Sequence, residues 1–227
     1  MRRLVRENSL SSNDFILPIF VTEGKNKKIP IKTMPEVYRY SEDKLSQIVD
    51  KALKLKIPMV AIFPQTNTGL KDTYGSEALN ENNLVCKAIR KIKNRYKNEI
   101  GIMTDVALDP YTSHGHDGIL RDKKILNDET IEILIQQSLL QAQMGSDVIA
   151  PSDMMDGRIG EIRQELDNNS LKDIKILSYA VKYASSFYGP FRDAVGSKKS
   201  LKGDKKTYQM DFSNSEEALR EVALDIK

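Results

Sequence analysis

The fold is decided by the stretch SYAVKYASSFYGPFRDA, residues 178–194, because its first half has the pattern of a β-strand. Large apolar side chains alternate there with small ones, and Lys182 lies among the small ones near the end of the predicted strand, residues 175–184. In a (β/α) barrel the carboxyl ends of the strands carry the reacting groups. The two predicted faces are Leu177, Tyr179, Val181 and Tyr183 on one side, and Ser178, Ala180, Lys182 and Ala184 on the other.

Lys182 is open to two interpretations. A lysine whose stem is held in apolar surroundings is uncharged for part of the time, and its neutral amine can attack a carbonyl carbon to form a Schiff base. Alternatively, the side chain reaches from the strand end into solvent, which is the commoner arrangement for lysines. The spacing of the residues alone leaves both interpretations open.

The remaining chain alternates between strand-like and helix-like segments. Ser41 is expected to head the first helix and Ser213 the last, and Gly145 is expected to end the third. The last helix is expected to bury one side, formed by Ala218, Leu219, Val222, Ala223 and Ile226. This alternation predicts parallel βαβ units with right-handed crossovers, in an α/β fold. The predicted strands are residues 16–21, 59–64, 100–109, 147–153 and 175–184, and the predicted helices are residues 41–53, 84–92, 128–142, 158–168 and 213–226.

Five such units fit either a doubly wound open sheet or part of a (β/α)8 TIM barrel. Two long segments, residues 110–127 and 185–212, both follow predicted strand ends and would lie over the same end of the sheet. Loops of that length are typically lids or binding elements, which favours the barrel. Since a closed barrel needs eight units, we expect residues 15–227 to form an incomplete, C-terminally truncated TIM-barrel catalytic domain with about the first five.

Residues 1–14 are basic and lack periodicity, so we predict an N-terminal arm. It would either pack on a neighbouring subunit or fray as a terminus.

Composition excludes several classes of protein. The 227 residues are 40% hydrophobic and 30% charged, with a net charge of +3, which is typical of a globular chain. One cysteine, Cys86, permits no disulfide within the chain and fits a reducing, cytoplasmic location. No run of about 18 apolar residues predicts a membrane span, and no nucleic-acid-binding motif accompanies the mild positive charge.

Three segments of the sequence together resemble those of the porphobilinogen synthase, or delta-aminolevulinate dehydratase, family: TDVALDPYTSHGHDGIL, APSDMMDGRIGEIR and YAVKYASSFYGPFRDAVGS. The resemblance implies a TIM-barrel lyase that condenses two delta-aminolevulinate molecules into porphobilinogen with loss of water, in haem and tetrapyrrole biosynthesis. It further implies a homo-octamer, and a Schiff base between Lys182 and one substrate. The family's second Schiff-base lysine lies in a VKPG-like word that these 227 residues do not contain.

The resemblance also implies roles for residues that the pattern alone leaves open. Without it, Arg192 and Lys205 are at least as consistent with a solvated basic loop as with two cations that hold a substrate carboxylate. With it, both are expected to bind the carboxylate. Ser152, near the end of one predicted strand, and Asp105, within another, are likewise expected to contact the substrate.

Metal binding is predicted chiefly from the resemblance. Zinc-dependent members have three cysteines where this chain has Ala107, Asp109 and Asp117, and zinc prefers thiolate or imidazole ligands, so no catalytic zinc is expected. Asp109 and Asp117 could instead hold a hard cation or offset nearby lysines. Glu221 is expected to bind an allosteric Mg²⁺, with Asp153 close to it.

Three weaker hypotheses remain open from the sequence. His114 and His116 suggest a metal site, although packing or loop hydrogen bonding explains two histidines better. A Schiff-base aldolase on the same barrel would share Lys182, but it gives no reason for the long basic lid. The chain could also be a non-enzymatic, truncated remnant.

Overall fold

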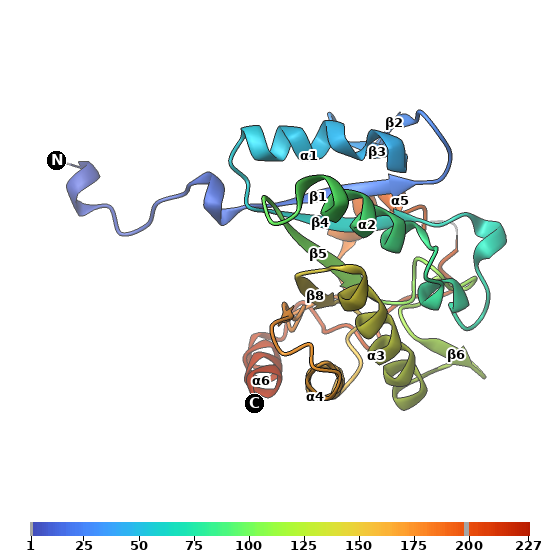
Figure 1. Ribbon diagram of the computed structural model, residues 1–227. Helices are drawn as coiled ribbons and strands as arrows, with labels where there is room; N and C mark the ends of the chain where they lie inside the picture. The colour runs from blue at the N-terminus through green and yellow to red at the C-terminus, as the bar shows by residue number, and fades with distance from the viewer. Residues whose placement is uncertain (1, 198–199) are drawn as a thin grey trace.

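Five parallel strands make up the centre of the computed structural model, which describes residues 2–197 and 200–227 (Figure 1). Met1 of the predicted arm, and residues 198 and 199 of the predicted long loop, lie outside this description. Neighbouring strands follow the order of the chain without a reversal, which distinguishes this sheet from a doubly wound one. The strands are β1 (Ile16–Thr22), β4 (Met59–Gln65), β5 (Gly101–Val106), β8 (Val148–Pro151) and β9 (Lys175–Ile176).

Four helices cover one face of this sheet, and each contacts the next, as in the outer layer of a TIM barrel. With the fifth helix, Ser215–Ile226, the prediction of about five β/α units is confirmed, and the helix ends lie within a few residues of those expected. Gly145 ends α3 in the left-handed conformation, at φ 110°, where a side chain would be strained. The helices are α1 (Leu45–Lys54), α2 (Leu84–Tyr96), α3 (Asn127–Met144) and α4 (Arg158–Asn168).

Alternate residues of each strand separate an outer core from an inner one. Ile19 and Ile62 point outward against α1 and α2, whereas Phe20 and Phe63 point inward. Both faces are apolar, which is the reason the strands read as continuous hydrophobic runs. The helices α1 to α4 leave the inner face free, and a site can form there.

Two hairpins were not predicted, and they occupy segments expected to be loops. Strands β2 (Lys28–Pro30) and β3 (Tyr38–Tyr40) extend the sheet beyond β1, with β3 parallel to β1. Strands β6 (Ile119–Arg121) and β7 (Lys124–Leu126) form a separate ribbon between β5 and α3. Each strand has three residues, too few for a clear period-2 pattern. Short 3₁₀ helices span Arg2–Val5, Ser12–Asp14, Glu42–Lys44, Thr68–Leu70, Ser76–Leu79 and Ser186–Tyr188.

The strand predicted at residues 175–184 is shorter than expected, and its side chains do not alternate between two faces as expected. Regular pairing ends at Ile176, although Leu177 and Tyr179 still donate backbone hydrogen bonds to β8. Leu177, Tyr179 and Lys182 all line one cavity, so the alternation breaks between Tyr179 and Lys182. The expected third strand also ends early, at Val106 rather than Asp109.

Two helices follow β9: α5 (Gly189–Ala194) and α6 (Ser215–Ile226). The predicted N-cap of the last helix is wrong, because Asn214 takes that position and Ser213 instead donates to Asp211. Of the side chains expected to be buried on α6, only Ala218 is, whereas Leu219 is 68% exposed.

The N-terminal residues extend away from the sheet (Figure 1), and Leu4, Val5 and Leu10 are largely exposed. In the part of the chain described, no helix is long and apolar enough to cross a bilayer.

Candidate active site

An apolar cavity of about 630 Å³ opens on the inner face of the sheet. Its walls come from alternate residues of the first three parallel strands, such as Phe20, Phe63 and Met103. Polar groups enter only at the carboxyl end of the sheet: Asp105 ends β5, Ser152 follows β8, and Lys182 follows β9. An apolar pocket with a few converging polar groups is the usual form of a small-molecule site.

Lys182 points into this cavity, with its side chain only 10% exposed. Its Nζ donates a hydrogen bond to the carbonyl oxygen of Ser152 and lies 3.8 Å from Oδ1 of Asp117. The Tyr188 ring lies alongside, with its centroid 5.8 Å from Nζ. The alternative in which this lysine reaches into solvent is therefore wrong, and the amine faces an apolar hollow instead.

Asp105 lies close enough to Lys182 to share its electrostatic environment. Burial raises the pKa of Asp105 to about 7, although Lys182 acts in the opposite direction. The Ser152 side chain also lowers the pKa of this carboxyl. A carboxyl that titrates near neutral pH can both donate and accept a proton, which suits general acid–base chemistry.

A buried ion cluster lies beside Lys182. Lys205 Nζ is 2.8 Å from Oδ2 of Asp117 and 3.3 Å from Oδ2 of Asp109. Burial would raise the pKa of Asp117, but Lys205 and Lys182 together hold it below its usual value. Burial raises the pKa of Asp109 in spite of Lys205. For Lys205, the two carboxylates outweigh burial and raise the pKa.

The cluster bears on two predictions. Lys205 occupies the space between Asp109 and Asp117 where a cation was expected, so these carboxylates offset lysines in this structure; a metal ion there stays a prediction. Lys205 itself is engaged with carboxylates rather than open to a substrate. Arg192 lies half-buried on α5, outside the residues that line the cavity.

Lys71 is a residue that sequence reasoning missed. It lies in the loop after β4, where a lysine among polar residues gives no signal. Its Nζ is buried without a hydrogen-bond partner among the described residues, and it faces Asp109. Burial lowers the pKa of Lys71, against the effect of Asp109.

His114 and His116 take the loop-packing role rather than a metal-binding one. His116 Nδ1 lies 3.1 Å from the Tyr208 hydroxyl, and its Nε2 lies 2.8 Å from the Lys202 carbonyl oxygen. His114 Nε2 lies 3.3 Å from the Thr73 carbonyl oxygen. Both histidines therefore join the segment after β5 to neighbouring loops.

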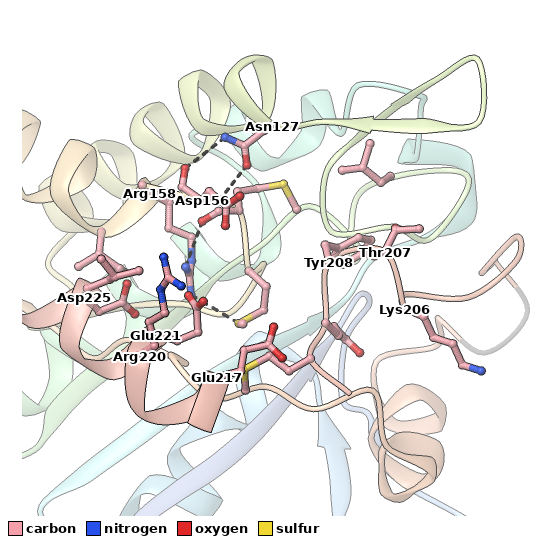
Figure 2. A pocket seen from close by; sticks show the side chains of 18 of the residues that line it. Asn127, Asp156, Arg158, Lys206, Thr207, Tyr208, Glu217, Arg220, Glu221 and Asp225 are labelled. Atoms are coloured by element: carbon pink, nitrogen blue, oxygen red, sulfur yellow. Dashed lines mark hydrogen bonds between the residues drawn. The ribbon is translucent and has the colours of Figure 1, made fainter. Parts of the chain in front are cut away.

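A larger cleft of about 1460 Å³ lies apart from Lys182, between α6, α4 and the β6–β7 ribbon (Figure 2). Figure 2 shows Glu217, Arg220 and Glu221 projecting from α6 into it. The lysines that line it, Lys123, Lys124 and Lys206, are all exposed, so we place the chemistry in the smaller cavity, where Lys182 is buried.

Of the two residues expected near a magnesium ion, Glu221 lines this cleft, whereas Asp153 is not among its lining residues. Asp153 is buried, accepts a hydrogen bond from Met155 N–H at 2.7 Å, and lies 3.3 Å from the buried Arg158 guanidinium. Burial raises its pKa to about 6, against the effect of Arg158. Among the described residues, no three His, Cys, Asp or Glu side chains form a group that could hold a metal. Glu221 could supply a single carboxylate, and Mg²⁺ often takes its remaining ligands from water.

Similarity to known proteins identifies the family to which this chain belongs. A model of the delta-aminolevulinic acid dehydratase family matches residues 1–227. The chain belongs to this family. A relative from Bradyrhizobium diazoefficiens, named delta-aminolevulinic acid dehydratase, is 57% identical over 99% of this chain and 64% of its own length. A relative of the same name from Rhodobacter capsulatus is 47% identical over 100% of this chain and 68% of its own length.

A solved structure supports the same family and the fold. The Toxoplasma gondii porphobilinogen synthase, in complex with the reaction product porphobilinogen, superposes with a TM-score of 0.95 at 43% identity. The match covers 99% of this chain and 64% of that one. The chain thus carries part of the family's TIM barrel and spans about half to two thirds of the length of the relatives it matches. Nothing in the comparisons favours the aldolase alternative.

Proposed function

We propose that this chain forms the part of a porphobilinogen synthase that binds one delta-aminolevulinate molecule covalently, as a Schiff base on Lys182. The observation that carries the proposal is the Lys182 amine, nine-tenths buried at the polar end of an apolar cavity. The family membership and the names of the relatives supply the substrate. In the complete reaction, two such molecules condense to porphobilinogen with loss of water.

The neighbouring residues suit imine formation. The lone pair of the neutral Lys182 amine forms a bond to the ketone carbon. The nitrogen gives up two protons in all, the ketone oxygen gains two, and the carbon–oxygen bond breaks as that oxygen leaves as water. With a pKa of about 7, Asp105 is protonated in part of the molecules at neutral pH and can deliver a proton to that oxygen. The Ser152 carbonyl oxygen orients the amine, because it accepts its hydrogen bond.

The substrate carboxylate needs a cation, for which Arg192 and Lys205 are the proposed groups. Lys205 would have to exchange its contact with Asp109 or Asp117 for the substrate, whereas Arg192 would have to turn toward the cavity. Arg192 is the better candidate for the first contact, because its planar guanidinium can bind a carboxylate through two hydrogen bonds.

The further roles implied by the resemblance are kept as proposals. If Mg²⁺ binds, Glu221 would hold it as a structural ion at the larger cleft, and no step at Lys182 passes through it. An octameric assembly and a cytoplasmic location stay predictions.

The test is to trap the imine. The chain is incubated with delta-aminolevulinate and borohydride, and the reduced adduct is located by mass spectrometry of its peptides. One adduct on Lys182 is expected, and none in Lys182→Met. Lys175→Met removes an exposed lysine on β9 and should label like the parent chain. A folded sample that is labelled elsewhere, or not at all, contradicts the proposal.

A further inference from the structure

Arg39 makes a long-range contact to the segment that carries Arg192. It lies on β3, and its Nε donates a hydrogen bond of 2.6 Å to the carbonyl oxygen of Ala194, the last residue of α5. Its Nη2 donates to the carbonyl oxygen of Asp193. The last carbonyl groups of a helix have no partner within the helix, and a cation there is favourable. Arg39 therefore caps α5 from a different part of the fold.

A second contact from the same region reinforces this cap. Thr33, in the turn between β2 and β3, donates through its hydroxyl to Oδ2 of Asp193 at 2.8 Å. The same hydroxyl lies 3.4 Å from the Pro190 carbonyl oxygen. Both ends of α5 are thus joined to the β2–β3 hairpin, which sequence reasoning had taken for a loop.

Aromatic packing holds the other side of α5 against the cavity wall. The Phe191 ring meets the Phe63 ring nearly at a right angle, with centroids 5.2 Å apart, and lies 6.1 Å from the Phe20 ring. These inner-face residues also line the cavity that holds Lys182. In Figure 1, α5 lies on the side of β1 away from α1, which is the inner side of the sheet. The helix is therefore seated over the cavity that contains the reactive amine.

We infer that Arg39 is a positioning residue for substrate binding: it holds α5 over the cavity so that Arg192 can reach the substrate carboxylate. The inference rests on the carboxylate-binding role proposed for Arg192. A short helix of six residues has little stability of its own, so its place depends on contacts made from outside it. Arg39 supplies two such contacts with one planar group, which a lysine cannot do.

The experiment is a double-mutant cycle on the 227-residue chain, measured as the delta-aminolevulinate concentration that gives half-maximal borohydride trapping. Arg39→Met alone should raise this concentration about tenfold, and Arg39→Lys should raise it less. If Arg39 acts through Arg192, then Arg39→Met should change it less than twofold in an Arg192→Met background. Lys32→Met, an exposed neighbour on the same hairpin, should leave it unchanged.

The possible outcomes distinguish failure of this inference from failure of the role proposed for Arg192, on which it rests. If Arg192→Met weakens trapping and the effect of Arg39→Met multiplies with it, then Arg39 has only a structural role and the inference fails alone. If Arg192→Met has no effect while Lys182 is still labelled, the carboxylate role of Arg192 fails and the inference fails with it. Should Arg39→Met not fold by circular dichroism, Thr33→Val removes the 2.8 Å bond to Asp193, and the same cycle with Arg192→Met decides the question.

Discussion

Lys205 lies 2.8 Å from the Asp117 carboxylate, and the two side chains are only 8% and 1% exposed. Asp109 shares the same ammonium at 3.3 Å. Buried charges of this kind stabilise a fold only as a set, because each is costly to leave without its partner. The cluster joins the loop after β5 to the loop that precedes α6.

Replacing Lys205 by methionine should strongly destabilise the chain. The substitution leaves two buried carboxylates without their ammonium partner, and the loss of one member of a buried pair costs about 3–5 kcal/mol. The free energy of unfolding in urea measures the effect. Lys91→Met, an exposed lysine on α2, is the control and should change stability by about 0.5 kcal/mol or less. A loss for Lys205→Met as small as that of the control would contradict the description of the cluster.

Replacing Lys71 by methionine, unlike replacing Lys205, should not destabilise the chain. Its ammonium is buried without a hydrogen-bond partner among the described residues, so its methionine variant removes a desolvated charge. We expect Lys71→Met to be neutral or slightly stabilising, within about 1 kcal/mol, in the same urea experiment. A loss of more than about 2 kcal/mol would show that Lys71 pairs with Asp109 in solution.

Asp105 predicts a pH dependence of stability. The pKa of Asp105 is about 7 in the folded chain, which is above its value in the unfolded chain. The folded state therefore keeps this proton up to a higher pH than the unfolded state does. The contribution of the protonated Asp105 to the free energy of unfolding is present below about pH 4. It is lost as pH rises toward 7, by at most about 4 kcal/mol. In Asp105→Asn this part of the slope should vanish.

The measurement for Asp105 is the difference in unfolding free energy between the parent chain and Asp105→Asn at several pH values. The raised pKa of Asp153 acts in the same direction in both proteins and cancels in the difference. A difference that stays constant between pH 4 and 7 would mean that Asp105 titrates normally.

Glu221 predicts an effect of magnesium on stability. If it is the carboxylate that holds Mg²⁺, the ion should raise the melting temperature of the parent chain, because a ligand of the folded state stabilises it. Glu221→Gln should abolish this shift. Glu216→Gln, in the same cleft, should retain it. Equal shifts in all three proteins would assign the ion to another place.

Local residue patterns were sufficient for the main elements of the fold. The apolar runs at β1 and β4 and the stripe on α2 depend on neighbours within a few residues, so periodicity alone locates them. The hairpin β2–β3 could not be found in this way, since each strand has three residues and its pairing partner, β1, supplies the stability. The exposed face of α6 was mispredicted because periodicity shows which face is apolar, not whether anything covers it.

Sequence by itself determined that strands alternate with helices, that Lys182 belongs to the segment of the fifth strand, and that three segments of the chain resemble those of one family. Only the tertiary structure decided that Lys182 faces the cavity, that Lys205 pairs with Asp109 and Asp117, and that Arg39 caps α5. The physical reason is the distance along the chain over which each kind of interaction acts. Backbone periodicity is set by adjacent residues, whereas buried charges meet partners from distant loops only after the sheet has brought its strand ends together.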